Sequence, residues 1–175
     1  DCVHHLRGMF AFALWDTEKK RLLAARDHLG QKPFFYCNRD GVFAFASEIK
    51  ALLAFDPSLR EINLEALDQY LALRLIASPR SMFKNIHKLS PGHALIVRVG
   101  EPPRIWRYWD LRYEPKLTGS EDELTDALEE QILISLRLHL ASDVPVGAFL
   151  SGGLDSSLIV AMLARHCVPK GFPTF

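Results

Sequence analysis

The stretch SGGLDSS, residues 151–157, lies between two apolar segments of different pattern. The preceding residues 144–150 (VPVGAFL) form a short apolar run that is typical of a buried β-strand. The following residues 154–165 have the spacing of a helix, and the two glycines before them predict a tight loop. A strand, a loop and a helix in this order predict the opening of a doubly wound, parallel α/β domain.

The loop has the residue types of an anion-binding site. Its two glycines permit unusual backbone conformations and close approach of an anion, and the following helix offers free N–H groups. Asp155 adds a carboxylate that can hold Mg2+ beside a polyphosphate. The simpler alternative is a Gly-Ser turn in which Asp155 caps the helix. The GxxxxGK[ST] spacing of the usual P-loop is missing from the sequence.

The pattern of the chain changes near residue 115, where residues 115–120 are expected to form a linker. Ser120 and Glu123 have the spacing of a capping box. A long amphipathic helix is predicted after them, because apolar side chains recur every four residues at Leu124, Leu128, Ile132, Leu136 and Leu140. We therefore expect two parts, residues 1–114 and residues 115–175.

Residues 1–114 are expected to form paired strands and short helices. Asp40-Gly41 is the hairpin signal of one strand pair. Ser47 and Asn63 are each expected to cap a helix. The expected strands are residues 9–15, 21–25, 32–36, 42–46, 94–99 and 104–113, and the expected helices are residues 48–55 and 64–73.

Composition describes a globular chain of 175 residues, 49% hydrophobic and 24% charged. Lys+Arg and Asp+Glu both number 21, so the zero net charge argues against a nucleic-acid partner and a polybasic membrane anchor. No apolar run approaches the roughly 18 residues of a membrane helix. Three separated cysteines outside any CxxC motif argue against disulfides and zinc and favour the cytoplasm.

The chain is expected to be a fragment. It starts with Asp1 rather than Met, and residues 171–175 stop where an apolar segment begins. A functional site is then expected to be present only in part.

Five segments carry a family resemblance. SGGLDSS resembles the pyrophosphate-binding loop of ATP pyrophosphatases. LRGMFAFALWDTEKKRLLAARDHLGQKPFFY (residues 6–36), FASEIKALL (45–53), KLSPGHAL (88–95) and SDVPVGAFLSGGLDSS (142–157) are similar, in this order, to segments of glutamine-hydrolysing asparagine synthetases. The resemblance covers essentially the whole chain.

The resemblance implies a two-part enzyme and an α/β fold. Residues 1–114 would be the C-terminal part of a glutaminase domain of the αββα N-terminal-nucleophile hydrolase type. Residues 115–175 would be the opening strand, loop and helix of a doubly wound parallel ATP-pyrophosphatase domain, truncated. The family releases ammonia from glutamine, converts aspartate and ATP to β-aspartyl-AMP and pyrophosphate, and displaces AMP with ammonia.

The resemblance also assigns residues to the ATP site. The loop residues would hold the pyrophosphate end of ATP, and Asp155 would help to hold Mg2+. Phe149 and Leu150 stand where the family contacts the nucleotide. The expected site is Phe149, Leu150, Ser151, Gly152, Gly153, Asp155, Ser156 and Ser157.

No catalytic residue of the glutaminase half is expected in this chain. The family's nucleophile is an N-terminal cysteine followed by Gly-Ile, whereas Cys2 is followed by Val3-His4-His5 and lies in a segment that is late in that domain. We therefore expect the nucleophile to lie upstream, and Cys2 to be a small apolar residue on a helix.

Other candidate sites have simpler interpretations. Arg26-Asp27-His28 is expected to form a structural turn with an internal Arg–Asp pair, and the Ser47-Glu48 pair is expected to start a helix. The aromatic residues Trp106, Tyr108 and Trp109 are expected to pack between the domains. His4, His5 and His166-Cys167 are expected at helix ends rather than in metal sites.

Two alternatives stay open at this stage. One is a related carboxylate-adenylating synthetase, such as a β-lactam synthetase, because the acceptor-binding residues are not in the sequence. The other is a non-catalytic piece or interaction module. For the enzyme we expect ATP and Mg2+ as cofactors, aspartate and glutamine as further small-molecule substrates, and a homodimer as a compatible assembly.

Overall fold

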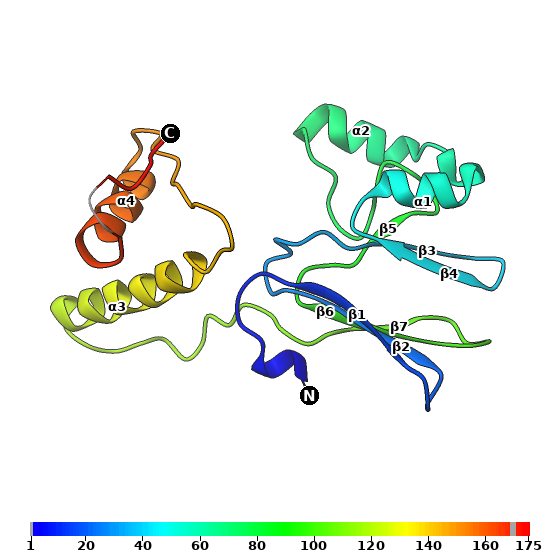
Figure 1. The fold of residues 1–175 in the computed structure, drawn as a ribbon, viewed down its shortest axis with the longest axis horizontal. Helices are drawn as coiled ribbons and strands as arrows, with labels where there is room; N and C mark the ends of the chain where they lie inside the picture. Colours follow the sequence, from blue (N-terminus) through cyan, green and yellow to red (C-terminus); the bar gives the residue numbers. More distant parts are fainter. Residues whose placement is uncertain (1, 169–170) are drawn as a thin grey trace. The chain divides into compact units, whose positions relative to one another are not determined.

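The computed structural model describes residues 2–168 and 171–175, which form two compact units. Unit 1 ends at Leu111, and unit 2 begins at Arg112. Within the described residues, unit 1 holds strands β1 to β7 and helices α1 and α2, whereas unit 2 holds helices α3 and α4 (Figure 1). Among the described helices, none combines the length and hydropathy that crossing a membrane requires.

Unit 1 contains a four-stranded antiparallel sheet. The expected pair at its edge is confirmed, because Ala11 lies opposite Arg26 and Asp16 lies opposite Arg21. The second strand of this pair also pairs with β6, and β6 pairs with β7, so the order is β1-β2-β6-β7. The strands are β1 (Ala11–Asp16), β2 (Arg21–Arg26), β6 (His93–Arg98) and β7 (Arg104–Arg107).

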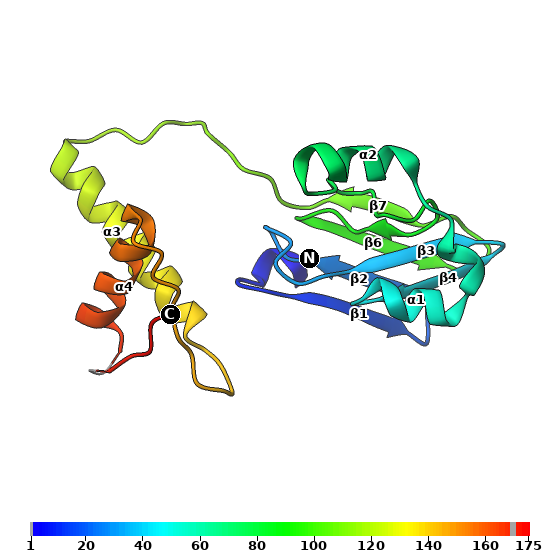
Figure 2. The same ribbon diagram turned by 90° about the horizontal axis from the view of Figure 1, so that it is seen from above.

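A second, three-stranded antiparallel sheet faces the first (Figure 1), and the two sheets overlie one another when they are seen from above (Figure 2). Its order is β4-β3-β5, and the strands are β3 (Phe35–Arg39), β4 (Val42–Ala46) and β5 (His87–Lys88). The predicted hairpin is confirmed. Asp40 and Gly41 both have positive φ, 52° and 78°, as a two-residue hairpin turn between twisted strands requires.

Helices cover the outer face of the three-stranded sheet. They are α1 (Ile49–Phe55) and α2 (Leu64–Leu73), with a 3-10 turn, η2 (Pro57–Arg60), between them. Asn63 caps α2 as predicted, since its Oδ1 accepts a hydrogen bond from Ala66 N–H. The prediction for Ser47 is wrong: Glu48 is the N-cap residue of α1, and it makes no side-chain capping bond.

Three apolar clusters hold unit 1 together. Between the sheets, Ala24 and Leu95 pack on Phe34, Tyr36 and Leu89. The second cluster joins the three-stranded sheet to its helices, and the third lies on the outer face of the four-stranded sheet. The buried members of the second cluster are Cys37, Leu52, Leu59 and Ile86. The buried members of the third cluster are Val3, Ala25 and Ala94, and partly buried aromatic side chains pack against them: Phe10, Phe12, Trp106 and Tyr108.

His87 makes the stability of unit 1 depend on pH. Its ring centroid lies 5.5 Å from that of Tyr36, and burial lowers the pKa of His87 from its ordinary value of 6.5. The contribution of neutral His87 to the free energy of unfolding is therefore complete above pH 6.5, and it is lost as the pH falls through the lower pKa of the folded state. We expect the urea midpoint to fall below pH 6.5, and a smaller fall in His87→Gln. An equal fall in both proteins would contradict this role.

Unit 2 contains the predicted long helix, α3 (Glu121–His139), and a second helix, α4 (Leu154–His166). The capping box is confirmed: Glu123 N–H donates to Ser120 Oγ at 3.3 Å, and Ser120 N–H donates to Glu123 Oε2 at 2.8 Å. The described side chains of α3 remain partly or fully exposed, whereas α4 buries Met162 and Leu163.

Replacing Ser120 with alanine is expected to fray the start of α3. The change removes the acceptor for Glu123 N–H, which costs about 1 kcal/mol at a helix N-cap. Hydrogen exchange at the first helical amides should accelerate about fivefold, with Thr118→Ala as the control outside the helix. Unchanged exchange in Ser120→Ala would show that the box does not stabilise the helix.

The prediction of a buried strand at residues 144–150 is wrong. In the described part of unit 2, the segment makes one isolated bridge, from Ala148 to Thr174, and Phe149 is 84% exposed. A strand that is buried in a parallel sheet needs neighbours along both edges, and residues 173–175 supply one short partner here. At the coarser level, the α/β prediction is confirmed as mixed helices and antiparallel sheets.

Candidate functional site

The SGGLDSS loop turns directly into the first turn of α4. Gly152 has φ of +83°, a left-handed conformation that favours glycine. Gly153 is the N-cap residue, with extended backbone and no side chain to cap the helix. A Cβ at Gly152 would meet no atom within 4 Å, and one at Gly153 would meet only Ser151 Oγ, at 3.6 Å. The space beside both glycines is therefore open to a ligand.

Free N–H groups lie in the first turn of α4, next to these glycines. The N–H groups of Leu154, Asp155 and Ser156 have no acceptor within the helix, as in any α-helix, whereas Ser157 N–H donates to Gly153 C=O at 3.1 Å. Because Gly153 supplies no capping oxygen, these donors are left for a ligand or water. Together with the helix dipole, they favour an anion.

The serines of the loop are already organised by hydrogen bonds. Ser151 Oγ and Ser156 Oγ lie 3.0 Å apart, and Ser156 Oγ–H donates to Gly153 C=O at 3.2 Å. Ser157 and Asp155 are exposed on the first turn. The hydroxyl groups of Ser151 and Ser156 are thus brought together across the two glycines, and each would exchange its present acceptor for a phosphate oxygen if it donated to a bound phosphate.

The residues just before the loop pair in parallel with the last residues of the chain. Ala148 N–H donates to Pro173 C=O, Phe175 N–H donates to Ala148 C=O, and Leu150 N–H donates to Phe175 C=O, over 2.7–3.0 Å. Helix α4 connects the two paired segments, as a crossover helix does in a parallel sheet. A Cβ at Gly147 would come within 2.6 Å of the Phe175 ring, so this pairing also depends on a glycine that the sequence analysis did not single out.

The predicted nucleotide-contacting residues are exposed at the end of this segment. Phe149 and Leu150 are 84% and 42% exposed, and the Phe149 ring lies 6.4 Å from that of Phe175. All eight predicted site residues therefore lie in one continuous stretch at the start of α4. Their exposure leaves them available to a ligand, and their role remains a prediction.

The donor set at the loop suits Mg2+ only when phosphate oxygens complete it. Among the described residues, no group of three or more His, Cys, Asp or Glu side chains could hold a metal ion. Asp155 offers one carboxylate beside the serine hydroxyls. Mg2+ is commonly held by one or two carboxylates together with substrate phosphates and water, and this arrangement fits the residues present.

The Arg26–Asp27 turn is structural, but the predicted Arg–Asp ion pair is not formed among the described residues. Asp27 accepts hydrogen bonds from backbone N–H groups at its Oδ1 and Oδ2, and Arg26 donates to backbone carbonyls. Main-chain groups of a tight turn satisfy both side chains, which removes the need for a direct pair. The sequence signal that could have pointed to this is the glycine and proline content of residues 26–33 and 90–92.

The aromatic residues in and just after β7 pack within unit 1, which corrects the expectation that they lie between domains. Trp106 and Tyr108 pack on the cluster of Val3, Ala25 and Ala94. The Trp109 ring stacks on His28, with centroids 4.6 Å apart and planes at 7°. These rings stabilise unit 1 and lie outside the SGGLDSS loop.

The three cysteines are free thiols in different surroundings. Cys2 lies exposed in a short 3-10 helix, η1 (Cys2–His5), rather than serving as a packed apolar residue as expected. Cys37 is buried in β3, and burial raises the pKa of its thiol, so the reactive thiolate is disfavoured. His166 lies at the end of α4 as predicted, 3.7 Å from Glu129.

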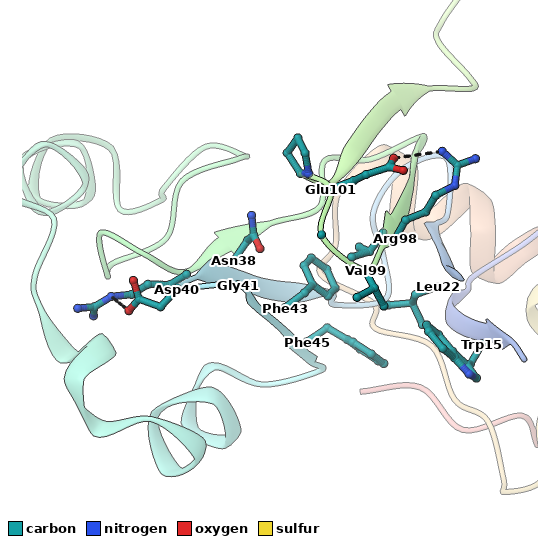
Figure 3. Close-up of a pocket in the computed structure, with 14 residues that line it drawn as sticks. Trp15, Leu22, Asn38, Asp40, Gly41, Phe43, Phe45, Arg98, Val99 and Glu101 are labelled. Carbon is teal, nitrogen blue, oxygen red and sulfur yellow. Dashed lines mark hydrogen bonds and ion pairs between the residues drawn. The ribbon is translucent and has the colours of Figure 1, made fainter. Parts of the chain in front are cut away.

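A cavity of about 640 Å³ opens between the two sheets of unit 1 (Figure 3). Phe43 and Phe45 on one sheet and Leu22 on the other form the apolar part of its wall, and polar or charged side chains complete the lining: Asn38, Arg39, Asp40, Arg98 and Glu101. Two of the charged groups at its rim, Arg98 and Glu101, pair with each other at 3.3 Å. This cavity therefore offers no converging catalytic groups comparable to the donors of the SGGLDSS loop.

Comparison with protein families assigns the two parts of the chain. Residues 1–109 match the family model described as glutamine amidotransferase domain. The chain belongs to the glutamine amidotransferase domain family. Residues 127–175, which include the SGGLDSS loop, match the family model described as asparagine synthase. The two matches occur in the order that the sequence resemblance implies, and they confirm it.

Curated relatives agree with these families. The chain is 42% identical over 172 residues to "Asparagine synthetase [glutamine-hydrolyzing] 3" of Bacillus subtilis, with 98% of this chain and 28% of the relative covered. It is 38% identical to "Putative asparagine synthetase [glutamine-hydrolyzing] 2" of Methanocaldococcus jannaschii, covering 100% of this chain and 34% of the relative. It is also 38% identical to "Amidase chry2" of Gibberella zeae, with 97% of this chain and 25% of the relative covered. The chain spans about a quarter to a third of the length of these relatives.

Proposed function

We propose that this chain is part of a glutamine-dependent asparagine synthetase. The observation that carries the proposal is the SGGLDSS loop at the start of α4, in a segment that matches asparagine synthase and follows a glutamine amidotransferase domain. The enzyme would form asparagine from aspartate, ATP and the ammonia released from glutamine. The cytoplasm is the proposed location, because all three cysteines are free thiols.

The proposed role of the loop is to bind the pyrophosphate portion of ATP. An aspartate carboxylate oxygen attacks the α-phosphorus, pyrophosphate leaves, and ammonia then displaces AMP from the acyl carbon. Negative charge accumulates on the departing pyrophosphate during the first step. The N–H groups of the first turn of α4 and the hydroxyls of Ser151, Ser156 and Ser157 can stabilise that charge by donating hydrogen bonds.

Mg2+ would neutralise phosphate charge when it is bound at this loop. Asp155 is the carboxylate available to hold it, and phosphate oxygens and water would complete its coordination. Phe149 and Leu150 would contact the nucleotide from the segment before the loop, where both side chains are exposed.

Two domain pieces are part of the proposal. Residues 1–114 would belong to a glutaminase domain of the αββα N-terminal-nucleophile type, supported by two facing antiparallel sheets with helices on one outer face. Residues 115–175 would open a doubly wound parallel ATP-pyrophosphatase domain, supported by α4 connecting two parallel segments. The nucleophilic cysteine would be supplied by another part of the polypeptide.

The second candidate is amide formation on a carboxylate other than that of aspartate. It is favoured by the similarity to "Amidase chry2", which is as close in identity as one of the asparagine synthetases, at 38%. A β-lactam synthetase would be a relative of this kind, with the same use of ATP. Both candidates share the loop chemistry and differ in the acceptor.

Isotope transfer in the full-length polypeptide that carries this chain tests the proposal. Aspartate labelled with 18O in its side-chain carboxylate is supplied with Mg-ATP and either glutamine or ammonium. We expect asparagine, pyrophosphate and AMP that carries one 18O atom. Formation of ADP and phosphate would refute adenylation. Labelled AMP from a different carboxylate, with aspartate inert, would select the second candidate.

A further inference from the structure

Two connections between the sheets of unit 1 meet at one end of the sandwich. Residues 27–34 lead from β2 to β3, and residues 89–92 lead from β5 to β6. The two connections are joined by main-chain bonds: Gly92 N–H donates to Asp27 C=O at 2.9 Å, and Leu89 N–H donates to Phe34 C=O at 3.0 Å. Tyr108 and Trp109, near the end of unit 1, lie on this junction.

The carboxylate of Asp27 organises the first connection. Asp27 is 1% exposed, and it accepts hydrogen bonds from the N–H groups of Gln31 and Lys32, both at 2.9 Å, and of Leu29 at 3.2 Å. These three bonds from N–H donors within residues 29–32 bend the chain back over the carboxylate. A neutral side chain could not accept all of them, because an amide or a protonated carboxyl presents a donor on one side.

Arg26 completes the junction from the other side. Its guanidinium donates to the carbonyl of Lys32 at 2.7 Å, of Gly30 at 2.6 Å and of Leu89 at 2.7 Å. The first two acceptors belong to the connection that Asp27 organises, and the third belongs to the other connection. The turn and the junction therefore share one set of polar contacts.

Tyr108 and Trp109 are held by atoms of this same junction. Tyr108 O–H donates to Arg26 C=O at 2.8 Å, and the N–H groups of Tyr108 and Trp109 donate to Gly92 C=O at 2.8 and 3.2 Å. The Trp109 ring stacks on His28, the residue next to Asp27. A Cβ at Gly92 would lie 2.6 Å from Trp109 C=O, so the segment fits closely against the turn.

We propose that the negative charge of Asp27 operates a latch on the segment Tyr108–Trp109: the charged carboxylate holds the segment closed, and neutralisation releases it while both sheets stay folded. The hydrogen bonds that hold the segment end at Arg26 C=O, at the last residue of β2, and at Gly92 C=O, and the Trp109 ring stacks on His28. The Tyr108 ring also packs on the cluster of Val3, Ala25 and Ala94, so release is expected to break the hydrogen bonds and the Trp109 stacking while the paired residues of β1, β2 and β6 stay in place. Trp109 lies two residues before the end of unit 1, so the latch acts at the C-terminal end of this unit.

The charged groups around the latch favour the closed state near neutral pH. Burial acts to raise the pKa of Asp27, but hydrogen bonds with the backbone of Lys32, Gln31, Phe10 and Leu29 outweigh it, so the pKa is lowered from 3.8. Burial and the nearby Asp27 charge raise the pKa of Tyr108 to about 12, so its hydroxyl remains a donor. Arg26 supplies a positive charge from the end of β2, and His28 and His4 contact the Tyr108 ring from the turn and from η1.

Fluorine NMR of the chain labelled with 5-fluorotryptophan tests the latch, because the chain has three tryptophans, Trp15 in β1, Trp106 in β7 and Trp109 in the segment, whose signals are assigned by replacing Trp106 and Trp109 in turn with phenylalanine. In Asp27→Asn we expect the Trp109 signal to move to its position in the unfolded chain, and exchange of the Trp109 amide to accelerate at least tenfold. The Trp15 signal should stay unchanged. The matched control is Asp40→Asn, an exposed carboxylate in a turn, which should move neither signal. An unchanged Trp109 signal in Asp27→Asn would overturn the proposal.

Acid titration of the unchanged chain decides the question if Asp27→Asn fails to fold. Because folding lowers the pKa of Asp27, the stabilisation that its charge gives to the closed segment is present above pH 3.8. This stabilisation is lost as the pH falls through the lower pKa of the folded state. We expect the Trp109 signal to move in this range before the Trp15 signal does. Simultaneous movement of both signals would mean that the junction is only part of global stability, and would overturn the latch.

Discussion

Replacing Asp155 with alanine is expected to reduce ATP-dependent amide synthesis by at least 10²–10³-fold in the full-length polypeptide, without unfolding α4. Losing one group that stabilises transition-state charge commonly has an effect of this size. Asp155 is exposed at the first turn, and the loop hydrogen bonds are made by Ser151, Ser156 and Gly153 instead. The rate of pyrophosphate release, measured at saturating Mg-ATP, is the readout.

The control for this prediction is Asp143→Ala, which removes another exposed carboxylate from the same unit. It should leave the rate unchanged. Asp155→Asn distinguishes charge from shape, since it retains the side-chain volume and loses the anionic ligand for Mg2+. Wild-type rates in both Asp155 variants would refute the assignment of this loop to Mg-ATP. A loss of helical circular dichroism in Asp155→Ala would instead point to a capping role.

Local signals in the sequence were sufficient for the elements that depend on neighbouring residues. The hairpin at Asp40-Gly41, the cap at Asn63 and the box formed by Ser120 and Glu123 are all confirmed. Each of these contacts spans no more than three residues, so the sequence contains both partners of the interaction. The order of the family segments was recognisable for the same reason.

The contacts that sequence reasoning missed join residues far apart in the chain. Arg26 reaches Leu89, and Tyr108 returns to Arg26, over separations of 63 and 82 residues. An adjacent arginine and aspartate suggested a pair, but the backbone groups of two connections compete for both side chains. The exposure of residues 144–150 has a similar cause, because burial of a strand depends on partners that its own pattern does not specify.

Replacing Arg26 with alanine is expected to destabilise unit 1 by about 3–5 kcal/mol, more than any other substitution proposed for this unit. Each of its three bonds to a carbonyl would be worth about 1.5–3 kcal/mol alone, and the cost of desolvating the guanidinium offsets part of their sum. The carbonyls of Gly30, Lys32 and Leu89 would lose this donor where the two connections meet. Urea unfolding followed by circular dichroism measures the change.

Two further variants separate the geometry of Arg26 from its charge. Arg26→Lys keeps the charge, but a single ammonium group cannot reproduce the planar arrangement of three donors, so at least half of the loss should remain. Arg39→Ala removes an arginine whose contacts, with Asp40 and Ser58, are exposed, and it should change stability by less than about 0.5 kcal/mol. Full rescue by lysine would mean that charge alone matters at this position. Equal losses in Arg26→Ala and Arg39→Ala would mean that the bond to Leu89, which joins the two sheet connections, contributes nothing specific to the fold.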